Sequence, residues 1–535
     1  MVIKSGYKRR RTLKAGTRRA ALPLAMMSSA LFIVACPTAI AQQLSPPDGY
    51  APASTPESAA QSQGGSAPVG TIAQPSVDNP GWVAGVTVGE LYTDNLRLAA
   101  SGRSKQASWI TQVEPFLRAA YSGKRLSGVI DYTLTGYLYE GQHHGKQLTH
   151  NLDAQGSVTV LPDHFFISGS AVYGSQIISN ETSAVPGTYF LSNNRANVAR
   201  GTLSPYWVQD VADVGTATLR YSYGRVVYNT NGIPSQKQSE NVLAGVPDVS
   251  SHTLQFGFSS PKDRSVGWNL RYSDQRIEPD YGRGLEYAIA QAGGYVELNY
   301  SLRLLADAGR ESQFFPDGSV DKLGASFWDV GVSWADALNS LEAKFGHRFY
   351  GRSYQFSWRH TAARLNTTVS YVEQPTDINQ QLLGQNPGDI VSTPVNGSII
   401  PSLSQRQAYL MKRATVSAEY DMPDSKLRVA MYDERRTFFA PGTRGERVRN
   451  ANVDWRFEVG AFTTLTPTLG WQRYKFRDGQ DRDNLYEELA LVHQFSAKDF
   501  ASVKFRHDTS DVSSALPGAH GYNVNVIFLQ WTHLL

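Results

Sequence analysis

The segment ANVDWRFEVGA, residues 451–461, decides the fold because its side chains alternate strictly in character. One parity reads Ala, Val, Trp, Phe, Val and Ala, and the other reads Asn, Asp, Arg, Glu and Gly. Successive side chains of a β-strand point to opposite faces. The segment therefore predicts a strand with one apolar face and one polar face.

The same alternation recurs along most of the chain. Residues 148–160 and 214–227 repeat it over more than ten positions, and residues 328–334 and 354–358 repeat it with Trp, Phe, Tyr and Val. Segments of about ten residues with this period, separated by turn residues, are typical of outer-membrane barrel strands. We expect an all-β region that extends from residue 82 to residue 535.

Two architectures fit alternating strands: a soluble sheet that packs its apolar face inward, and a membrane barrel that turns this face outward. Aromatic residues make up 11% of the chain, which suits the aromatic girdles of a barrel. The other parity is polar over four or five positions, as the wall of a water-filled lumen requires. These features favour a transmembrane antiparallel β-barrel of the bacterial outer-membrane type.

The connectors support this fold, because short and long ones alternate along the chain. We predict about 22 strands, from 82–92 to 520–533, with short turns such as 122–124, 161–163 and 423–425. The connectors 93–106, 179–195, 229–250 and 374–407 are longer. Outer-membrane barrels have short periplasmic turns and long outer loops, and an even strand number places both termini in the periplasm.

Residues 1–41 have the pattern of a secretory signal peptide. A basic stretch ends at Arg19, an apolar run follows at 20–35, and Ala39-Ile40-Ala41 matches a cleavage site. We expect cleavage after Ala41. Cys36, the single cysteine, ends a segment that resembles a lipoprotein box, so lipidation of Cys36 is the alternative.

The next region, 42–81, is rich in Pro, Ala, Ser, Gln and Gly and predicts a disordered periplasmic tail. It is too short and too polar for the folded plug of a TonB-dependent receptor, although such receptors also have 22 strands. Eight of the 51 Lys and Arg residues lie in the leader, which leaves 43 against 47 acidic residues. This balance argues against a nucleic-acid partner.

One motif lies in the first predicted strand, where residues 85–96 read GVTVGELYTDNL. Its Tyr92-Thr93-Asp94-Asn95 core resembles the start of the outer-membrane β-barrel proteins associated with PEP-CTERM/exosortase systems, as do residues 109–115 and 161–166. The resemblance implies a role linked to exopolysaccharide production and export. It implies no catalytic residue.

The polar parity is where function is expected, because it faces the lumen. Acidic and basic residues are balanced on it, which predicts a mesh of cross-strand pairs. A path for a polar glycan is the alternative interpretation. The candidate lumen residues are Lys344, Arg348, Arg359, Arg428, Asp454, Arg456 and Glu458.

Two connectors carry further hypotheses. The 34-residue connector 374–407 is long for a structureless loop, so it either folds into the pore or covers it. Arginines at 435, 436, 444, 447 and 449 surround the loop 438–448. They either contact lipopolysaccharide phosphates at the outer surface or form an ordinary solvated loop.

The sequence has no G-x-S-x-G, H-E-x-x-H or phosphate-binding glycine motif, and we expect neither an enzyme nor a metal or cofactor site. The leading hypothesis is a channel or accessory protein of exopolysaccharide export in the outer membrane of a Gram-negative bacterium. A general or nutrient-uptake porin and a non-conducting structural barrel are the alternatives. Expected partners are outer-membrane lipid and lipopolysaccharide, the outer-membrane assembly machinery, polysaccharide and export proteins.

Overall fold

The structure is a computed structural model of the 535-residue chain. It describes residues 75–535 except 141–144, 178–186, 192–193, 230–246, 262–263, 282–283, 315–322, 384–407, 440–441, 443, 477–478 and 514–519. The predictions for the leader and most of the tail, with Cys36 and Ala41, lie outside these residues.

The described part of the chain forms 22 strands and one short helix. The strands make one antiparallel sheet. The elements are β1 (Gly81–Thr93), β2 (Ser108–Ser122), β3 (Leu126–Tyr139), β4 (Gly145–Leu161), β5 (Phe165–Ile177), β6 (Arg195–Val211), β7 (Gly215–Asn229), β8 (Val249–Ser259), β9 (Val266–Pro279), β10 (Leu285–Asn299), β11 (Leu302–Phe314), β12 (Leu323–Ala335), β13 (Asn339–Arg348), β14 (Gly351–Thr361), β15 (Leu365–Thr376), α2 (Ile378–Leu383), β16 (Tyr409–Met422), β17 (Ser425–Phe438), β18 (Glu446–Gly460), β19 (Thr463–Lys475), β20 (Asp481–Gln494), β21 (Asp499–Val512) and β22 (Tyr522–Leu534).

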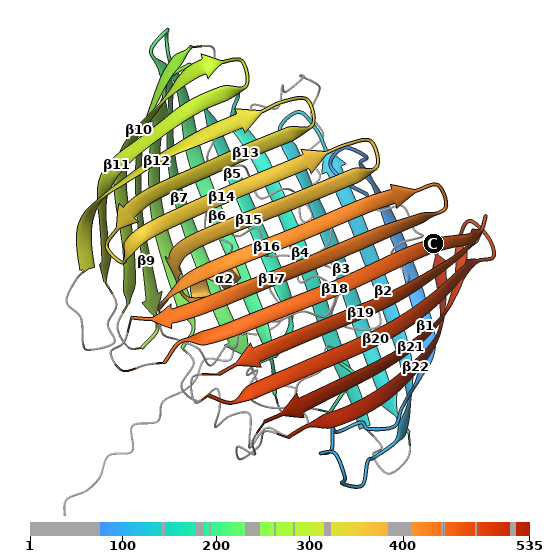
Figure 1. The fold of residues 1–535 in the computed structure, drawn as a ribbon. Coiled ribbons are helices and arrows are strands. Elements are labelled where there is room, and N and C mark those ends of the chain that lie inside the picture. Colours follow the sequence, from blue (N-terminus) through green and yellow to red (C-terminus); the bar gives the residue numbers. More distant parts are fainter. Residues whose placement is uncertain are drawn as a thin grey trace, which may run out of the picture. The chain divides into compact units, whose positions relative to one another are not determined.

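Each strand pairs with its neighbours in sequence, and β1 also pairs with β22, from Gly85 opposite Leu534 to Thr93 opposite Val526. The sheet is therefore a closed barrel, as Figure 1 shows. The predicted fold and the predicted strand number are both confirmed. Among the described residues, no helix is long and apolar enough to cross a bilayer.

The two ends of the barrel differ in their connectors. Connectors after even-numbered strands have two to six residues, whereas most of those after odd-numbered strands are longer. The turn 349–350 between β13 and β14 is the one tight connector at the long-loop end. The C-terminus lies at the short-turn end, where the backbone N–H of Leu535 donates to the carbonyl of Ala84 (Figure 1).

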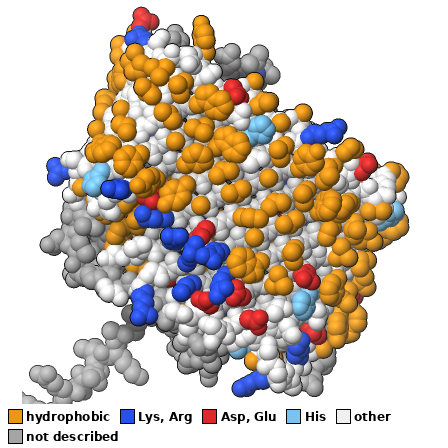
Figure 2. All heavy atoms as spheres, viewed as in Figure 1, with side chains coloured by type: hydrophobic (Ala, Val, Ile, Leu, Met, Phe, Trp, Pro, Cys, Tyr) orange, Lys and Arg blue, Asp and Glu red, His pale blue; other side chains and the backbone are white. Residues whose placement is uncertain are grey.

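The two faces of the wall follow the alternation in the sequence. Trp82, Leu148 and Val330 lie on the outward parity and are 65%, 60% and 48% exposed, whereas Thr87 and Leu91 on the inward parity are fully buried. Figure 2 shows the outer wall covered by hydrophobic side chains over most of its height. This is the surface that a barrel presents to lipid.

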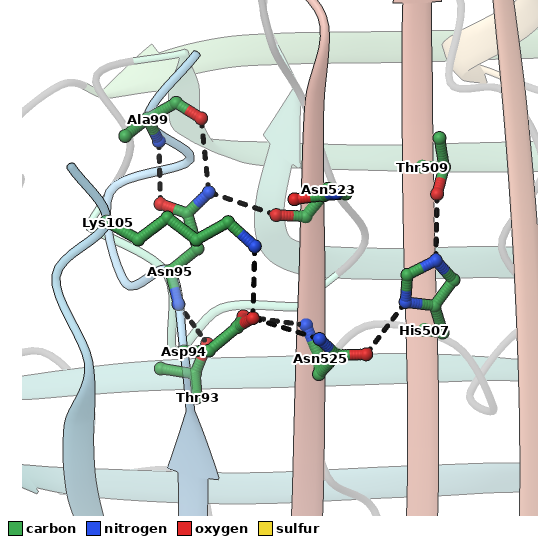
Figure 3. Close-up of polar contacts among 9 residues, drawn as sticks. All are labelled: Thr93, Asp94, Asn95, Ala99, Lys105, His507, Thr509, Asn523 and Asn525. Carbon is green, nitrogen blue, oxygen red and sulfur yellow. Dashed lines mark hydrogen bonds and ion pairs between the residues drawn. The ribbon is translucent and has the colours of Figure 1, made fainter. Parts of the chain in front are cut away.

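Residues 93–95 of the Tyr92-Thr93-Asp94-Asn95 motif lie at the seam between the first and last strands, where Asp94 and Asn95 contact β22, as Figure 3 shows. The Asp94 carboxylate accepts hydrogen bonds from the backbone and side-chain N–H groups of Asn525, at 2.8 and 2.9 Å. It also forms an ion pair with Lys105 at 3.1 Å. The Asn95 amide donates to the carbonyls of Ala99 and Asn523 at 3.1 Å each. These contacts extend the pairing of β1 and β22 beyond the strands, so the motif has a structural role in closure.

Candidate functional site

The segment Asp377–Leu383 follows β15 and lies inside the barrel, where it contacts strands on another part of the wall. Side chains on β6, β7, β9 and β10 bond or pack against it. At least four strands separate β15 from β10 along the wall, so the segment reaches these partners through the lumen. Figure 1 shows α2 inside the wall, behind β16 and β17. We call residues 377–383 the inward segment.

Asp377 directly precedes the helix, and its side chain caps the N-terminus of the helix. Its Oδ1 accepts the backbone N–H groups of Asn379 at 2.7 Å and of Gln380 at 3.4 Å. An Asp side chain in this position satisfies N–H groups that the first turn leaves free. Its Oδ2 accepts the hydroxyl of Tyr287 on β10 at 3.1 Å. Burial raises the pKa of Asp377, and the hydrogen bonds from Asn379, Tyr287 and Gln380 offset part of this rise.

The other end of the inward segment is also held. The Arg200 guanidinium on β6 donates to the carbonyl of Leu382 at 2.7 Å, which places a cation at the C-terminal end of the helix. The Gln380 amide donates to Gln275 on β9 at 2.6 Å. Ile378, Leu382 and Leu383 pack against Val198 and Val226 of the inner wall. Polar and apolar contacts together fix the segment against β6–β10.

A second segment, residues 188–191, covers a different part of the inner wall at the same long-loop end. The Tyr139 hydroxyl donates to the carbonyl of Tyr189 at 3.0 Å, and the hydroxyls of Tyr137 and Thr188 lie 2.9 Å apart. Tyr189 also contacts the ring of Phe528 on β22 edge-on. These side chains belong to a buried apolar cluster on the inner faces of β22, β1, β2 and β3.

Charged side chains on the inner wall pair across and along the strands. Arg413 and Arg436 both contact the buried Glu434, the former through its Nε at 2.6 Å. Arg506 pairs with Asp508 at 2.8 Å and with Glu488 at 3.5 Å. A mesh of opposite charges was predicted for this face, and its described ion pairs have this form.

The predicted lumen residues lie on the inward parity but form two separate groups. On β13, Lys344 pairs with Asp307 and Glu342 at 3.3 Å each, and Arg348 pairs with Glu311 at 3.3 Å. Arg348 also pairs with Asp329 at 3.1 Å. Arg359 belongs to this side of the wall but lies opposite Ser340, near the short-turn end of β14.

The second group lies on β17 and β18. Arg428 donates to Glu419 at 2.7 Å and stands opposite Asp454 in the strand register. Arg456 stands opposite Lys426, and Glu458 stands opposite Thr464 near the short-turn end. Since β15 and β16 separate this group from β14, the seven residues do not form one site. Their part in a conduction path stays a prediction.

The residues of the inward segment and their partners on the wall were not predicted as site residues. Asp377, Gln380 and Arg200 carry no motif, and their pairing depends on a connector that crosses the barrel interior. The one sequence signal was the length of the connector 374–407. Of the two placements proposed for it, insertion into the barrel is the one that residues 377–383 adopt; residues 384–407 lie outside the described chain.

The chain was compared with known proteins. No family model and no curated protein match it. Among solved structures, a mutant of the ferric enterobactin receptor PfeA from Pseudomonas aeruginosa matches at 10% identity and a TM-score of 0.44, over 86% of this chain and 81% of that one. The siderophore receptor PirA from the same organism matches at 8% and 0.43, over 86% and 81%. The FrpB iron transporter from Neisseria meningitidis matches at 11% and 0.45, over 85% and 82%.

Proposed function

We propose that the protein is an outer-membrane channel for small polar solutes in nutrient uptake, with the inward segment as its constriction. The observation that supports this proposal is the fixed position of residues 377–383, which cross the lumen. Tyr287 holds the segment at Asp377, and Arg200 holds it at Leu382. A segment that is anchored in this way narrows the pore and sets the largest solute that passes.

The charges of the inner wall support a pore of low ionic selectivity. Rings of one sign make a channel select ions of the other sign. Here Arg348 faces Glu311 and Asp329, and Arg506 faces Glu488 and Asp508, so cations and anions neutralise each other locally. We therefore expect neutral and zwitterionic solutes to pass as readily as ions of similar size.

The test is a reversible lock on the inward segment. The side-chain amides of Gln275 and Gln380 are in direct contact, so the double variant Gln275→Cys/Gln380→Cys, made in a Cys36→Ser background, places two thiols on either side of this contact. A bifunctional methanethiosulfonate reagent then links the two shorter side chains, and a reductant releases the link. A second variant, Ile378→Asp/Leu382→Asp, removes the apolar contacts that hold the segment. Purified proteins are reconstituted for single-channel recording and for liposome swelling with neutral sugars of increasing size.

The wild type should conduct and pass small sugars, and the locked form should keep this behaviour. The Ile378→Asp/Leu382→Asp variant should admit larger sugars and conduct more. The single variant Gln380→Cys controls for the loss of one hydrogen bond. An absence of conductance and swelling in all of these proteins would exclude a channel.

The export hypothesis predicts a different phenotype. It rests on the resemblance of residues 85–96, and the structure gives Asp94 and Asn95 of this motif a role in barrel closure. An in-frame deletion separates the two hypotheses: loss of secreted polysaccharide, restored by the intact gene, indicates export. Normal polysaccharide with slower growth on a limiting small nutrient supports uptake.

A further inference from the structure

Basic side chains gather on the outer wall at the long-loop end of β16–β19, where most of the wall is apolar. One row of outward positions near this end runs across four neighbouring strands and consists of Lys412, Arg435, Arg447 and Lys475. The row below it contains Arg449 and Arg473 on β18 and β19. We call these six residues the outer basic patch; Figure 2 shows Lys and Arg gathered at this end of the facing wall.

The patch ends sharply where the apolar wall begins. One further step along the strands, the outward positions are Val416, Met431, Ala451, Trp471 and Leu485, which are paired across five strands. Successive outward rows are about 7 Å apart and neighbouring strands about 5 Å apart. The cations therefore form a compact surface directly above the lipid-facing band, at the level of the lipid headgroups.

The acidic neighbours leave part of this charge uncompensated. Arg447 and Arg449 contact Asp433, Arg473 contacts Asp481 at 2.6 Å, and Lys412 contacts Glu373 at 3.1 Å. Within the described chain, Arg435 and Lys475 have no ion-pair partner, and both are exposed. Arg473 also lies 3.8 Å from Asp483, so the six cations face four carboxylates, those of Glu373, Asp433, Asp481 and Asp483.

The opposite wall differs in its charge. At the long-loop ends of β9 and β10, the outward parity carries Asp274, Arg276, Glu278 and Glu286, which give an acidic surplus. A uniform band of solvated charges around the rim would not produce this difference. The outer basic patch is therefore a feature of one side of the barrel. In the sequence, five arginines surround the loop 438–448. Three of them, Arg435, Arg447 and Arg449, lie in β17 and β18 and not in a solvated loop. Arg436 faces inward, where it contacts the buried Glu434.

We propose that the outer basic patch binds the phosphate groups of lipid A, the acylated phosphoglycolipid of the outer leaflet. Guanidinium and ammonium groups form strong charge-assisted hydrogen bonds with phosphate oxygens. The acyl chains of the same molecule would lie along the apolar row below, next to Val416 and Trp471. A single lipid A molecule would thus contact both the basic patch, through its phosphates, and the apolar row, through its acyl chains. A free anion has no apolar part for the second contact, and a soluble protein does not enter the lipid-facing band.

The test uses the complete barrel refolded into a zwitterionic detergent without glycolipid. Binding is measured by titration with bisphosphorylated lipid A, monophosphorylated lipid A, fully dephosphorylated lipid A and inorganic phosphate. We expect the affinity to fall in this order. The variant Arg435→Gln/Lys475→Gln, which breaks no ion pair of the described chain, should bind bisphosphorylated lipid A at least about tenfold more weakly.

The matched control is Arg276→Gln/Arg310→Gln, which removes two exposed outward cations from the other wall. It should bind like the wild type, and both variants should melt like the wild type when no lipid is present. Equal binding of the dephosphorylated lipid, an equal effect of inorganic phosphate, or an equal loss in the control variant would each overturn the proposal.

Discussion

At the scale of single residues, Asp94 has the clearest structural effect, because one carboxylate joins the two ends of the barrel wall. It accepts two hydrogen bonds from Asn525 and pairs with Lys105 (Figure 3). Hydrogen bonds to a charged group contribute about 1.5–3 kcal/mol each, less where water competes. We predict that Asp94→Ala lowers the free energy of unfolding by about 2 kcal/mol, as measured by urea titration in micelles.

Lys105→Gln is the control for this prediction. It removes only the exposed ion pair, which contributes under about 1 kcal/mol. If Lys105→Gln destabilised the barrel as much as Asp94→Ala, the ion pair would be the important contact and the bonds to Asn525 would not.

The same residue predicts a dependence on pH. Burial raises the pKa of Asp94, but hydrogen bonds from Asn525 and the contact with Lys105 outweigh it and hold the pKa below its usual range. A depressed pKa means that the stabilisation is complete above the ordinary value of about 4 and is lost as the pH falls through the lowered pKa. The difference in unfolding free energy between the wild type and Asp94→Asn should therefore be larger at pH 7 than at pH 2.5. A difference that is the same at both pH values would contradict this.

At the scale of elements, the sequence predicted the strands in detail, but for the inward segment it gave only a long connector with two alternative placements. A strand that separates lipid from water must alternate, so segments such as 451–461 reveal their faces without any knowledge of neighbours. The inward segment has no such constraint. Its Asp377 and Gln380 are positioned by Tyr287 and Gln275, which lie about a hundred residues away in sequence.

Parity also has a limit in what it predicts about a site. It placed Lys344, Arg348, Arg428 and Asp454 on the correct face, because the face depends only on alternation. It did not separate β13 from β17, because the position around the barrel depends on the strand order and the register. The distinction between Arg436, which faces inward, and its neighbour Arg435, which faces outward, follows from alternation alone and was accessible from the sequence.

The inward segment predicts an effect of pH on conduction. The raised pKa of Asp377 means that the docked segment favours the protonated acid, so docking weakens as the pH rises from the ordinary carboxyl value through the raised one. Single-channel conductance of the wild type should be larger at pH 8 than at pH 5. Asp377→Asn keeps the cap but cannot ionise, and its conductance should change little between these values. A variant that retained the wild-type dependence would assign it to other groups.

At the scale of the whole molecule, the barrel has an outer surface suited to lipid and an inner surface suited to water. The outer wall exposes Trp82, Leu148, Val330 and many similar side chains, which would be costly in water, whereas the inner wall pairs its charges. The long-loop end adds the inward segment inside and the outer basic patch outside. A bilayer around the apolar band, with its phosphorylated leaflet at the long-loop end, satisfies all of these features together.

This placement predicts that the same substitution to arginine destabilises the barrel more on the outward face of the wall than on the inward face. Val330 on β12 is 48% exposed and faces outward, so Val330→Arg puts a cation against lipid and should cost about 2–4 kcal/mol if the site lies near the midplane. Gln355 on β14 is exposed on the inward parity, opposite Lys344, so Gln355→Arg adds the same side chain to a wet wall and should cost much less.

Both variants are unfolded by urea in lipid vesicles and, separately, in detergent micelles. The gap between them should be larger in vesicles, where lipid cannot rearrange around the charge as freely. A cost that is equal for the two variants in vesicles would contradict the assignment of the outward face to lipid.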